Sequence, residues 1–198
     1  MVLSGVKPFS VMRWWTLFLL LLVPLLLLIR DIIDNNLGAD PARTVVTELG
    51  FWAMTWLWLT LAVTPLRKQF NWSWLMRFRR MFGLYAFFYA VLHLLAFTAF
   101  LIEWRLDLLV RELTKRPYII VGTLALLLLL PLAATSTRAM QRKLGRRWLQ
   151  LHRLIYPASL LVLLHFVWQI RSDFGQHLFF ALLLAIMLGY RLYLKKRG

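Results

Sequence analysis

The 198-residue sequence contains no cysteine, and its acidic residues are few. Without thiolates the chain forms no disulfide, holds no iron–sulfur cluster and binds no zinc through cysteine. Eight Asp and Glu residues stand against 24 Lys and Arg residues, which leaves a net charge of +16. The sequence also lacks a phosphate-binding loop, a zinc-protease motif and a Ser/His/Asp set, so a hydrolase is disfavoured. Its polar segments are too short for a soluble catalytic domain, and any nucleotide-binding domain would belong to another protein.

What the chain has instead is a large share of apolar residues. Hydrophobic residues make up 61% of it, whereas about 45–50% is usual in soluble domains. They gather in six segments near the length that a helix needs to cross a bilayer, about 17–25 residues. These segments are residues 11–29, 49–66, 81–102, 118–134, 148–170 and 177–194. The sequence therefore predicts an all-α integral membrane protein, with a single transmembrane domain over residues 1–198 folded as a six-helix bundle. No cleavage site closely follows the first segment, so we expect an uncleaved helix rather than a signal peptide.

The charged residues between these segments alternate along the chain. One set of segments, residues 1–13, 67–80, 138–153 and 191–198, holds seventeen basic residues and no acid. The other set, residues 30–48, 103–116 and 171–176, holds the remaining seven basic residues and all eight acids. Because basic loops stay on the cytoplasmic side of a membrane, this alternation predicts that both termini are cytoplasmic. Topology and anionic lipid then explain the positive charge, and we expect the lipid bilayer rather than nucleic acid as its partner.

Two of the four histidines lie deep inside predicted spans. His93 is in the middle of the third span, and His165 is well within the fifth. Both spans start on the cytoplasmic side, so the two residues are expected at similar depths on parallel helices. Ionisable groups are costly inside a membrane, and they often mark functional sites. Two imidazoles at one depth could supply both axial ligands of a haem iron. The plainer alternative is that each histidine only forms a hydrogen bond with a neighbouring helix.

Other metals fit this pair of histidines less well. A structural zinc site needs about four protein ligands, and no acidic residue lies at the depth of His93 and His165. A haem needs only two axial ligands, an apolar slot and basic partners for its propionates, and the sequence contains all of these. His177 opens the last span at the outer surface, where solvation alone would account for it.

His152 points to a second, inner site near the cytoplasmic end of the fifth span. It precedes His165 by 13 residues, which is about 20 Å along a helix, so the two cannot share a metal. The facing start of the third span has no histidine, so the inner site would take a haem with another ligand, a flavin or a quinone. Nearby arginines suit the phosphate of FMN or a haem propionate, although topology and lipid phosphate also account for them. These arginines are Arg77, Arg79, Arg80, Arg147 and Arg153.

Three motifs resemble a known family. They are "RRMFGLYAFFYAVLHLLAF", "LAVTP" and "LHRLIYPASLLVLLHFVW". Together they are similar to the MsrQ (YedZ) family, the membrane subunits of bacterial periplasmic methionine-sulfoxide reductase systems. The resemblance covers essentially the whole chain. More distantly, the sequence resembles the ferric reductase-like transmembrane domain, whose members carry paired histidines on the third and fifth spans. The matching histidines here are His93, His152 and His165, and a fourth is missing.

The resemblance implies a haem b protein of the bacterial inner membrane. Such a protein passes electrons to MsrP, a periplasmic molybdenum-cofactor enzyme that reduces methionine sulfoxide in oxidised proteins. Its implied electron donor is the quinone pool, or a cytoplasmic flavin reductase acting through FMN, and the chain itself holds no residue that reduces methionine sulfoxide. Two alternatives remain open from the sequence. One is a stand-alone transmembrane ferric or quinone reductase, and the other is a non-redox membrane scaffold.

Overall fold

The computed structural model describes residues 8–169 and 174–197, and every regular element in that part of the chain is helical. The α-helices are α1 (Pro8–Ile33), α2 (Pro41–Phe70), α3 (Arg79–Ala96), α4 (Leu106–Lys115), α5 (Pro117–Ala134), α6 (Arg138–Leu144), α7 (Arg146–Leu151), α8 (Ile155–Val167) and α9 (Phe174–Arg197). Three short elements lie between them: the 3-10 turns η1 (Ser73–Arg77) and η3 (His152–Leu154), and the π-helical turn η2 (Phe97–Leu101). The predicted all-α class is confirmed.

Six helical stretches are long and apolar enough to cross a membrane. They are Met12–Ile33, Pro41–Phe70, Arg79–Leu101, Pro117–Ala134, Arg146–Val167 and Phe174–Leu194. The second begins well before the expected segment 49–66, because Asp40 caps α2 and its carboxylate accepts a hydrogen bond from the backbone N–H of Arg43 at 3.1 Å. Pro41 follows in the first turn, where a missing N–H costs nothing. These start signals extend the helix beyond its apolar run.

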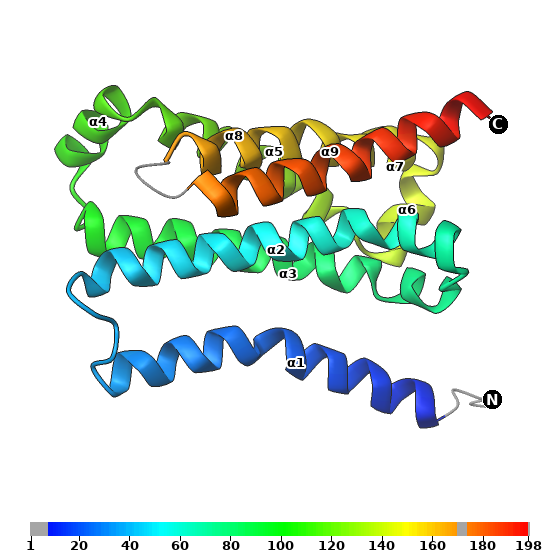
Figure 1. The fold of residues 1–198 in the computed structure, drawn as a ribbon, viewed down its shortest axis with the longest axis horizontal. Coiled ribbons are helices and arrows are strands. Elements are labelled where there is room, and N and C mark those ends of the chain that lie inside the picture. Colours follow the sequence, from blue (N-terminus) through cyan, green and yellow to red (C-terminus); the bar gives the residue numbers. More distant parts are fainter. Residues whose placement is uncertain (1–7, 170–173, 198) are drawn as a thin grey trace.

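The helices pack mainly in two antiparallel pairs, α2 with α3 and α5 with α8. Figure 1 shows both pairs lying side by side, with α9 beside α2 and α8, and α1 along the outer edge. The beginning of α1 and the end of α9 lie at the same end of the bundle (Figure 1). An even number of crossings therefore returns the chain to the side on which it started.

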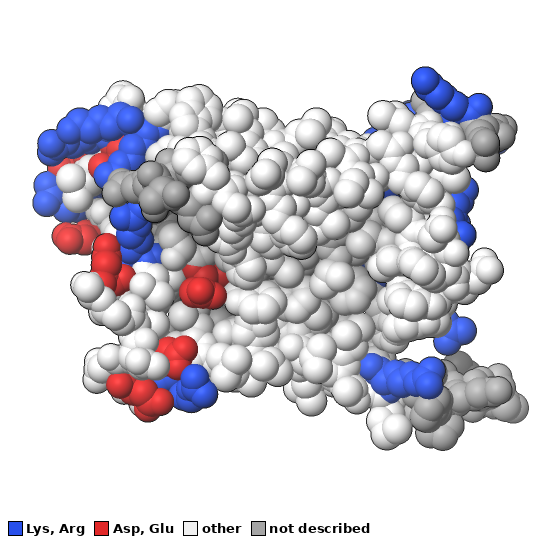
Figure 2. All heavy atoms as spheres, in the orientation of Figure 1, with Lys and Arg blue, Asp and Glu red and all other residues white. Residues whose placement is uncertain are grey.

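The charges separate between the two ends of the bundle, as the sequence predicts. In Figure 2 all the charged side chains visible at the end that carries the start of α1 and the end of α9 are basic. The opposite end shows acidic and basic side chains together, and uncharged residues cover the surface between the two ends (Figure 2). Arg171 and Asp173, which the sequence assigns to the mixed end, lie outside the described residues. This banding is typical of a protein that spans a membrane.

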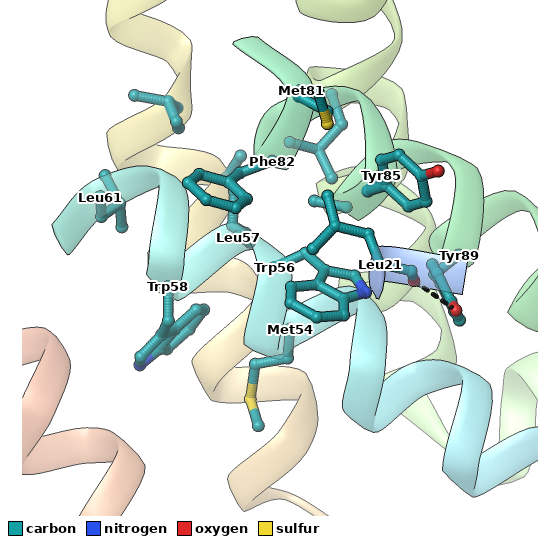
Figure 3. Packing of buried hydrophobic residues seen from close by; sticks show 14 of the residues in the cluster. Leu21, Met54, Trp56, Leu57, Trp58, Leu61, Met81, Phe82, Tyr85 and Tyr89 are labelled. Carbon is teal, nitrogen blue, oxygen red and sulfur yellow. Dashed lines mark hydrogen bonds between the residues drawn. The ribbon is translucent and has the colours of Figure 1, made fainter. Parts of the chain in front are cut away.

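The core holds α1 against α3 through a tyrosine hydroxyl. Pro24 interrupts α1 because proline has no N–H to donate to the preceding turn. Near this break the hydroxyl of the fully buried Tyr89 donates to the carbonyl of Leu21 at 3.0 Å and accepts from the N–H of Leu25 at 3.2 Å. Figure 3 shows the first of these bonds beside the packed aromatic and aliphatic side chains of α2 and α3. Tyr85 adds a parallel bond to the carbonyl of Phe18 at 2.7 Å.

Candidate functional site

The structure brings His93 of α3 and His165 of α8 together. Their ring centres are 6.1 Å apart, and the ring planes are inclined at 82°. The two helices belong to different helix pairs, so the imidazoles meet where the α2–α3 pair faces the α5–α8 pair. The sequence predicts a similar depth for these histidines, and the structure places them within contact distance of each other.

Each imidazole is anchored through the same ring atom to a backbone carbonyl of the helix paired with its own. Nδ1 of His93 lies 2.8 Å from the carbonyl oxygen of Val46, and Nδ1 of His165 lies 2.7 Å from that of Tyr118. A carbonyl oxygen only accepts, so each Nδ1 must donate, and the proton belongs on that atom. The lone pair then remains on Nε2. This is the tautomer that a metal-binding histidine needs, and such a bond fixes the orientation of its ring.

A glycine next to each carbonyl makes this approach possible. Gly50 follows Val46 by one helical turn, and a Cβ added to it would lie 2.9 Å from Nδ1 of His93. Gly122 follows Tyr118 by the same interval, and a Cβ there would lie 2.6 Å from Nδ1 of His165. In both pairs of helices the histidine comes 47 residues after its carbonyl partner. The two cradles therefore repeat one arrangement.

The pair of imidazoles fits a group that needs two protein ligands. A metal held between two imidazoles, at about 2.0–2.1 Å from each nitrogen, separates the ring centres by about 6 Å, close to the observed 6.1 Å. Among residues 8–169 and 174–197, no group of three or more His, Cys, Asp or Glu side chains could hold a metal ion. The donor set therefore fits an iron whose other ligands come from a porphyrin. The amide nitrogen of Gln169 lies 2.9 Å from Nε2 of His165. An amide nitrogen only donates, so this contact also makes Nε2 the acceptor atom of the ring.

His152 lies apart from this pair. It begins the 3-10 turn η3, where its ring stacks on Trp148 with centres 3.9 Å apart, and its Nδ1 lies 3.2 Å from the carbonyl of Trp148. The turn separates α7 from α8 because Pro157, in the first turn of α8, has no N–H to offer the carbonyl of Arg153. The helix is therefore interrupted at His152–Leu154, between α7 and the helix that carries His165. His177, by contrast, stacks on Phe166 with ring centres 4.1 Å apart.

The five arginines predicted to contact an anionic cofactor differ in their exposure. Arg79, at the start of α3, is partly buried. The other four are exposed: Arg77, Arg80, Arg147 and Arg153. Of the five, the structure therefore turns only Arg79 towards the interior of the bundle.

The mixed-charge end carries a turn of unusual backbone geometry. Glu103 and Trp104 both have positive φ angles, 53° and 58°, in the left-handed region that few residues other than glycine adopt. They lead into the short helix α4, whose first turn holds Asp107. Arg105 donates two hydrogen bonds to that carboxylate, at 2.7 and 3.2 Å, and thereby lowers the pKa of Asp107. Residues 103–116, which include this turn and α4, carry seven charged residues at the mixed-charge end, three acidic and four basic.

Several residues of the site escape analysis of the sequence. Gly50 and Gly122 are ordinary helical glycines until the histidines are placed against them, and only their equal distance from the two histidines hints at their role. Gln169 carries a weak signal, because it lies one turn after His165 in an otherwise apolar run. Arg191 looks like one of several basic residues near the C-terminus, yet its guanidinium contacts α2 and α8.

Comparisons with known proteins place this chain in a family. The ferric reductase like transmembrane component family matches residues 49–163, a segment that contains His93 and His152 and ends just before His165. The "Protein-methionine-sulfoxide reductase heme-binding subunit MsrQ" of Xanthomonas oryzae pv. oryzae is 47% identical over 162 residues, which cover 82% of this chain and 74% of the relative. The protein of the same name from Azospira oryzae is 44% identical over 177 residues, covering 88% and 76%. The chain therefore belongs to the MsrQ family and is built on a ferric reductase-like transmembrane domain.

Proposed function

We propose that this protein is a haem b-binding electron-transfer subunit of a methionine-sulfoxide reductase system, with His93 and His165 as the axial ligands of the iron. The neighbouring imidazoles carry the proposal, since each donates from Nδ1 to a backbone carbonyl and so has its lone pair on Nε2, the atom that would bind a metal once Gln169 moves away from His165. A haem b held there would supply reversible one-electron chemistry at its iron. The relatives carry the name heme-binding subunit, which supports the haem in this proposal.

The residues around the histidines prepare the site for electron transfer. The carbonyls of Val46 and Tyr118 hold both rings in one orientation and one tautomer, so little rearrangement accompanies a change of charge. If both His93 and His165 bound the iron, they would leave no open position for oxygen. The apolar spans on either side exclude water from the site.

The proposed location is the bacterial inner membrane, with the basic end of the bundle and both termini in the cytoplasm. Electrons enter at the basic end, near His152 and Arg79, from the quinone pool or from a cytoplasmic flavin reductase through FMN. They leave at the mixed-charge end for an MsrP-type periplasmic molybdenum-cofactor enzyme, which reduces methionine sulfoxide in oxidised proteins. Outward flow of an electron runs with an inside-negative potential, a gain of about 2.3 kcal/mol per 100 mV.

Absorption spectra of the purified protein test the ligand assignment. Reduced-minus-oxidised spectra of haem-replete wild type should show a six-coordinate b-type signal. His93→Ala and His165→Ala should each lose that signal, whereas His152→Ala should keep it. A colourless wild type, or an unchanged spectrum in His93→Ala, would refute the proposal. Histidine tautomers in the haem-free protein give an independent readout, because ¹⁵N shifts should report a proton on Nδ1 of both residues.

Electron delivery tests the proposed partner. Reduced wild-type protein should pass electrons to a purified periplasmic molybdenum-cofactor methionine-sulfoxide reductase, measured as loss of methionine sulfoxide. Rapid reduction of free ferric chelates without transfer to that enzyme would instead identify a stand-alone reductase.

A further inference from the structure

The side chain of Gln169 folds back over the end of α8 and reaches His165. The helix ends at Val167, and in the turn that follows the N–H of Gln169 donates to the carbonyl of Phe166 at 3.3 Å. The amide nitrogen of the Gln169 side chain lies 2.9 Å from Nε2 of His165 and 3.2 Å from the carbonyl oxygen of the same residue. One side chain therefore contacts the imidazole and also caps the helix that carries it.

The direction of the hydrogen bond between Gln169 and His165 follows from the other nitrogen of the ring. Nδ1 of His165 carries the proton, because it donates to the carbonyl of Tyr118. Nε2 then has a lone pair and no proton, so the amide of Gln169 is the donor. A metal would bind through the same lone pair. A hydrogen bond from Gln169 and a bond to a metal therefore exclude each other at this nitrogen.

His93 lacks a neighbour of this kind. The residue four positions after it, as Gln169 is after His165, is Phe97, whose side chain has no donor. The chain also remains helical here, since α3 continues into η2 and the backbone N–H of Phe97 donates to the carbonyl of His93. In the part of the chain that the structure describes, the ring of His93 forms a hydrogen bond only through Nδ1, to Val46. The two histidines are thus held alike at Nδ1 and differ at Nε2.

We propose that Gln169 makes His165 the weaker of the two axial ligands. The inference rests on the proposed function, because it concerns the haem that His93 and His165 would share. Whenever Nε2 of His165 is not bound to a metal, the amide of Gln169 donates to it and stabilises the free imidazole. No electron or proton moves in this exchange, since the lone pair stays on Nε2 and only its partner changes. Gln169 is therefore a positioning residue that acts through His165.

This difference gives the site one firm ligand and one exchangeable ligand. His93 has no internal competitor for its Nε2, so we expect it to bind an incoming haem first. His165 closes the site afterwards, when its ring gives up the hydrogen bond from Gln169. The same hydrogen bond favours release of His165 rather than His93 when an external ligand competes for the iron.

Two affinities test the inference, and they should change in opposite directions. Gln169→Met removes the donor at nearly the same side-chain length. The variant should bind haem about two- to tenfold more tightly, because no hydrogen bond has to break when His165 binds. After reduction it should bind carbon monoxide about two- to tenfold more weakly, because the histidine that carbon monoxide displaces has lost its partner. A purely structural role of Gln169 predicts weaker haem binding instead.

A second variant, a control and a measurement without haem accompany this test. Gln169→Leu also lacks a donor and should reproduce Gln169→Met, so the test stands if one of the two variants fails to fold. Gln176→Met makes the same change at an exposed residue of α9 and should leave both affinities unchanged. The start of α9 lies at the same end of the bundle as the end of α8 (Figure 1). In the haem-free protein, Gln169→Met should change the ¹⁵N shift of Nε2 in His165 and leave that of His93 unchanged.

Failure of the inference can be distinguished from failure of the proposed function. Wild type without a six-coordinate haem signal would refute the proposed function. An intact signal in wild type, with both affinities unchanged or both lowered in Gln169→Met, would overturn the role of Gln169 alone. Reduced wild type that keeps its six-coordinate spectrum under saturating carbon monoxide would also overturn it, because neither histidine would then be exchangeable.

Discussion

Gly122 lies directly against the imidazole of His165, and a Cβ added to this glycine would be 2.6 Å from Nδ1 and 2.7 Å from Cε1 of the ring. A real Cβ does not approach another heavy atom so closely, so alanine here must displace the ring or the helix. Gly50 stands in the same relation to His93, at 2.9 Å. Both glycines therefore leave the space that a histidine ring occupies against the neighbouring helix.

Gly122→Ala and Gly50→Ala should weaken haem binding, with the larger loss at Gly122. Each displaced ring loses its bond to the backbone carbonyl, worth about 0.5–1.5 kcal/mol or up to about tenfold in affinity. Alanine favours the helical conformation over glycine by about 1 kcal/mol. The haem-free variants should therefore not lose stability because of a weaker helix propensity. Haem titration and thermal unfolding of the haem-free protein measure the two effects separately. Gly189→Ala is the control, since an added Cβ there meets nothing within 4 Å; equal affinities in all three variants would contradict the positioning role.

Tyr89→Phe should destabilise the attachment of α1 more than Tyr85→Phe does. Removal of the Tyr89 hydroxyl takes a donor from Leu21 and an acceptor from Leu25, and an unsatisfied buried group costs about 1–3 kcal/mol. Tyr85 donates only to the carbonyl of Phe18. Thermal unfolding in detergent measures the difference. Equal losses of stability in the two variants would show that the two hydrogen bonds of Tyr89 stabilise the protein no more than the single bond of Tyr85.

Pro65→Ala should partly compensate for the loss of Arg191. Alanine at position 65 restores an N–H that can bond to the carbonyl of Leu61, which Arg191 otherwise satisfies. Arg191→Gln alone should therefore cost more stability than Arg191→Gln in the Pro65→Ala background, by about 1 kcal/mol or more. A double-mutant cycle of unfolding free energies gives this coupling directly. Additive effects would mean that Arg191 and the Leu61 carbonyl do not depend on each other.

The carboxyl group of Asp107 should titrate below the ordinary range of an aspartate. Hydrogen bonds from Arg105 lower its pKa, so the ion pair is present above the ordinary pKa and is lost as the pH falls through the lowered one. Arg105→Gln should return the pKa of Asp107 towards its usual value, as measured by ¹³C NMR of the labelled carboxyl carbon. The pair is exposed, so the variant should leave the unfolding temperature nearly unchanged. An unshifted titration in wild type would refute the contact.

The sequence alone determines the transmembrane class of this protein. The long apolar segments must cross the bilayer as helices, because backbone N–H and C=O groups without hydrogen bonds are too costly in lipid. The number of such segments gives the number of spans. The segregation of all eight acids into alternate segments determines which ends of the helices lie together. The depths of His93 and His165 follow from the same count, because the rise per residue of a helix is fixed.

Only the tertiary structure decided which way the side chains face. Each residue turns the helix by about 100°. A boundary uncertain by one residue therefore leaves open whether Arg79 or Arg80 faces the interior of the bundle. The turn η3 resets the helical phase between His152 and His165, and its position depends on how Pro157 is accommodated. The roles of Gly50 and Gly122 emerge only when a second helix lies against them, since the absence of a Cβ has meaning only when another atom occupies its place.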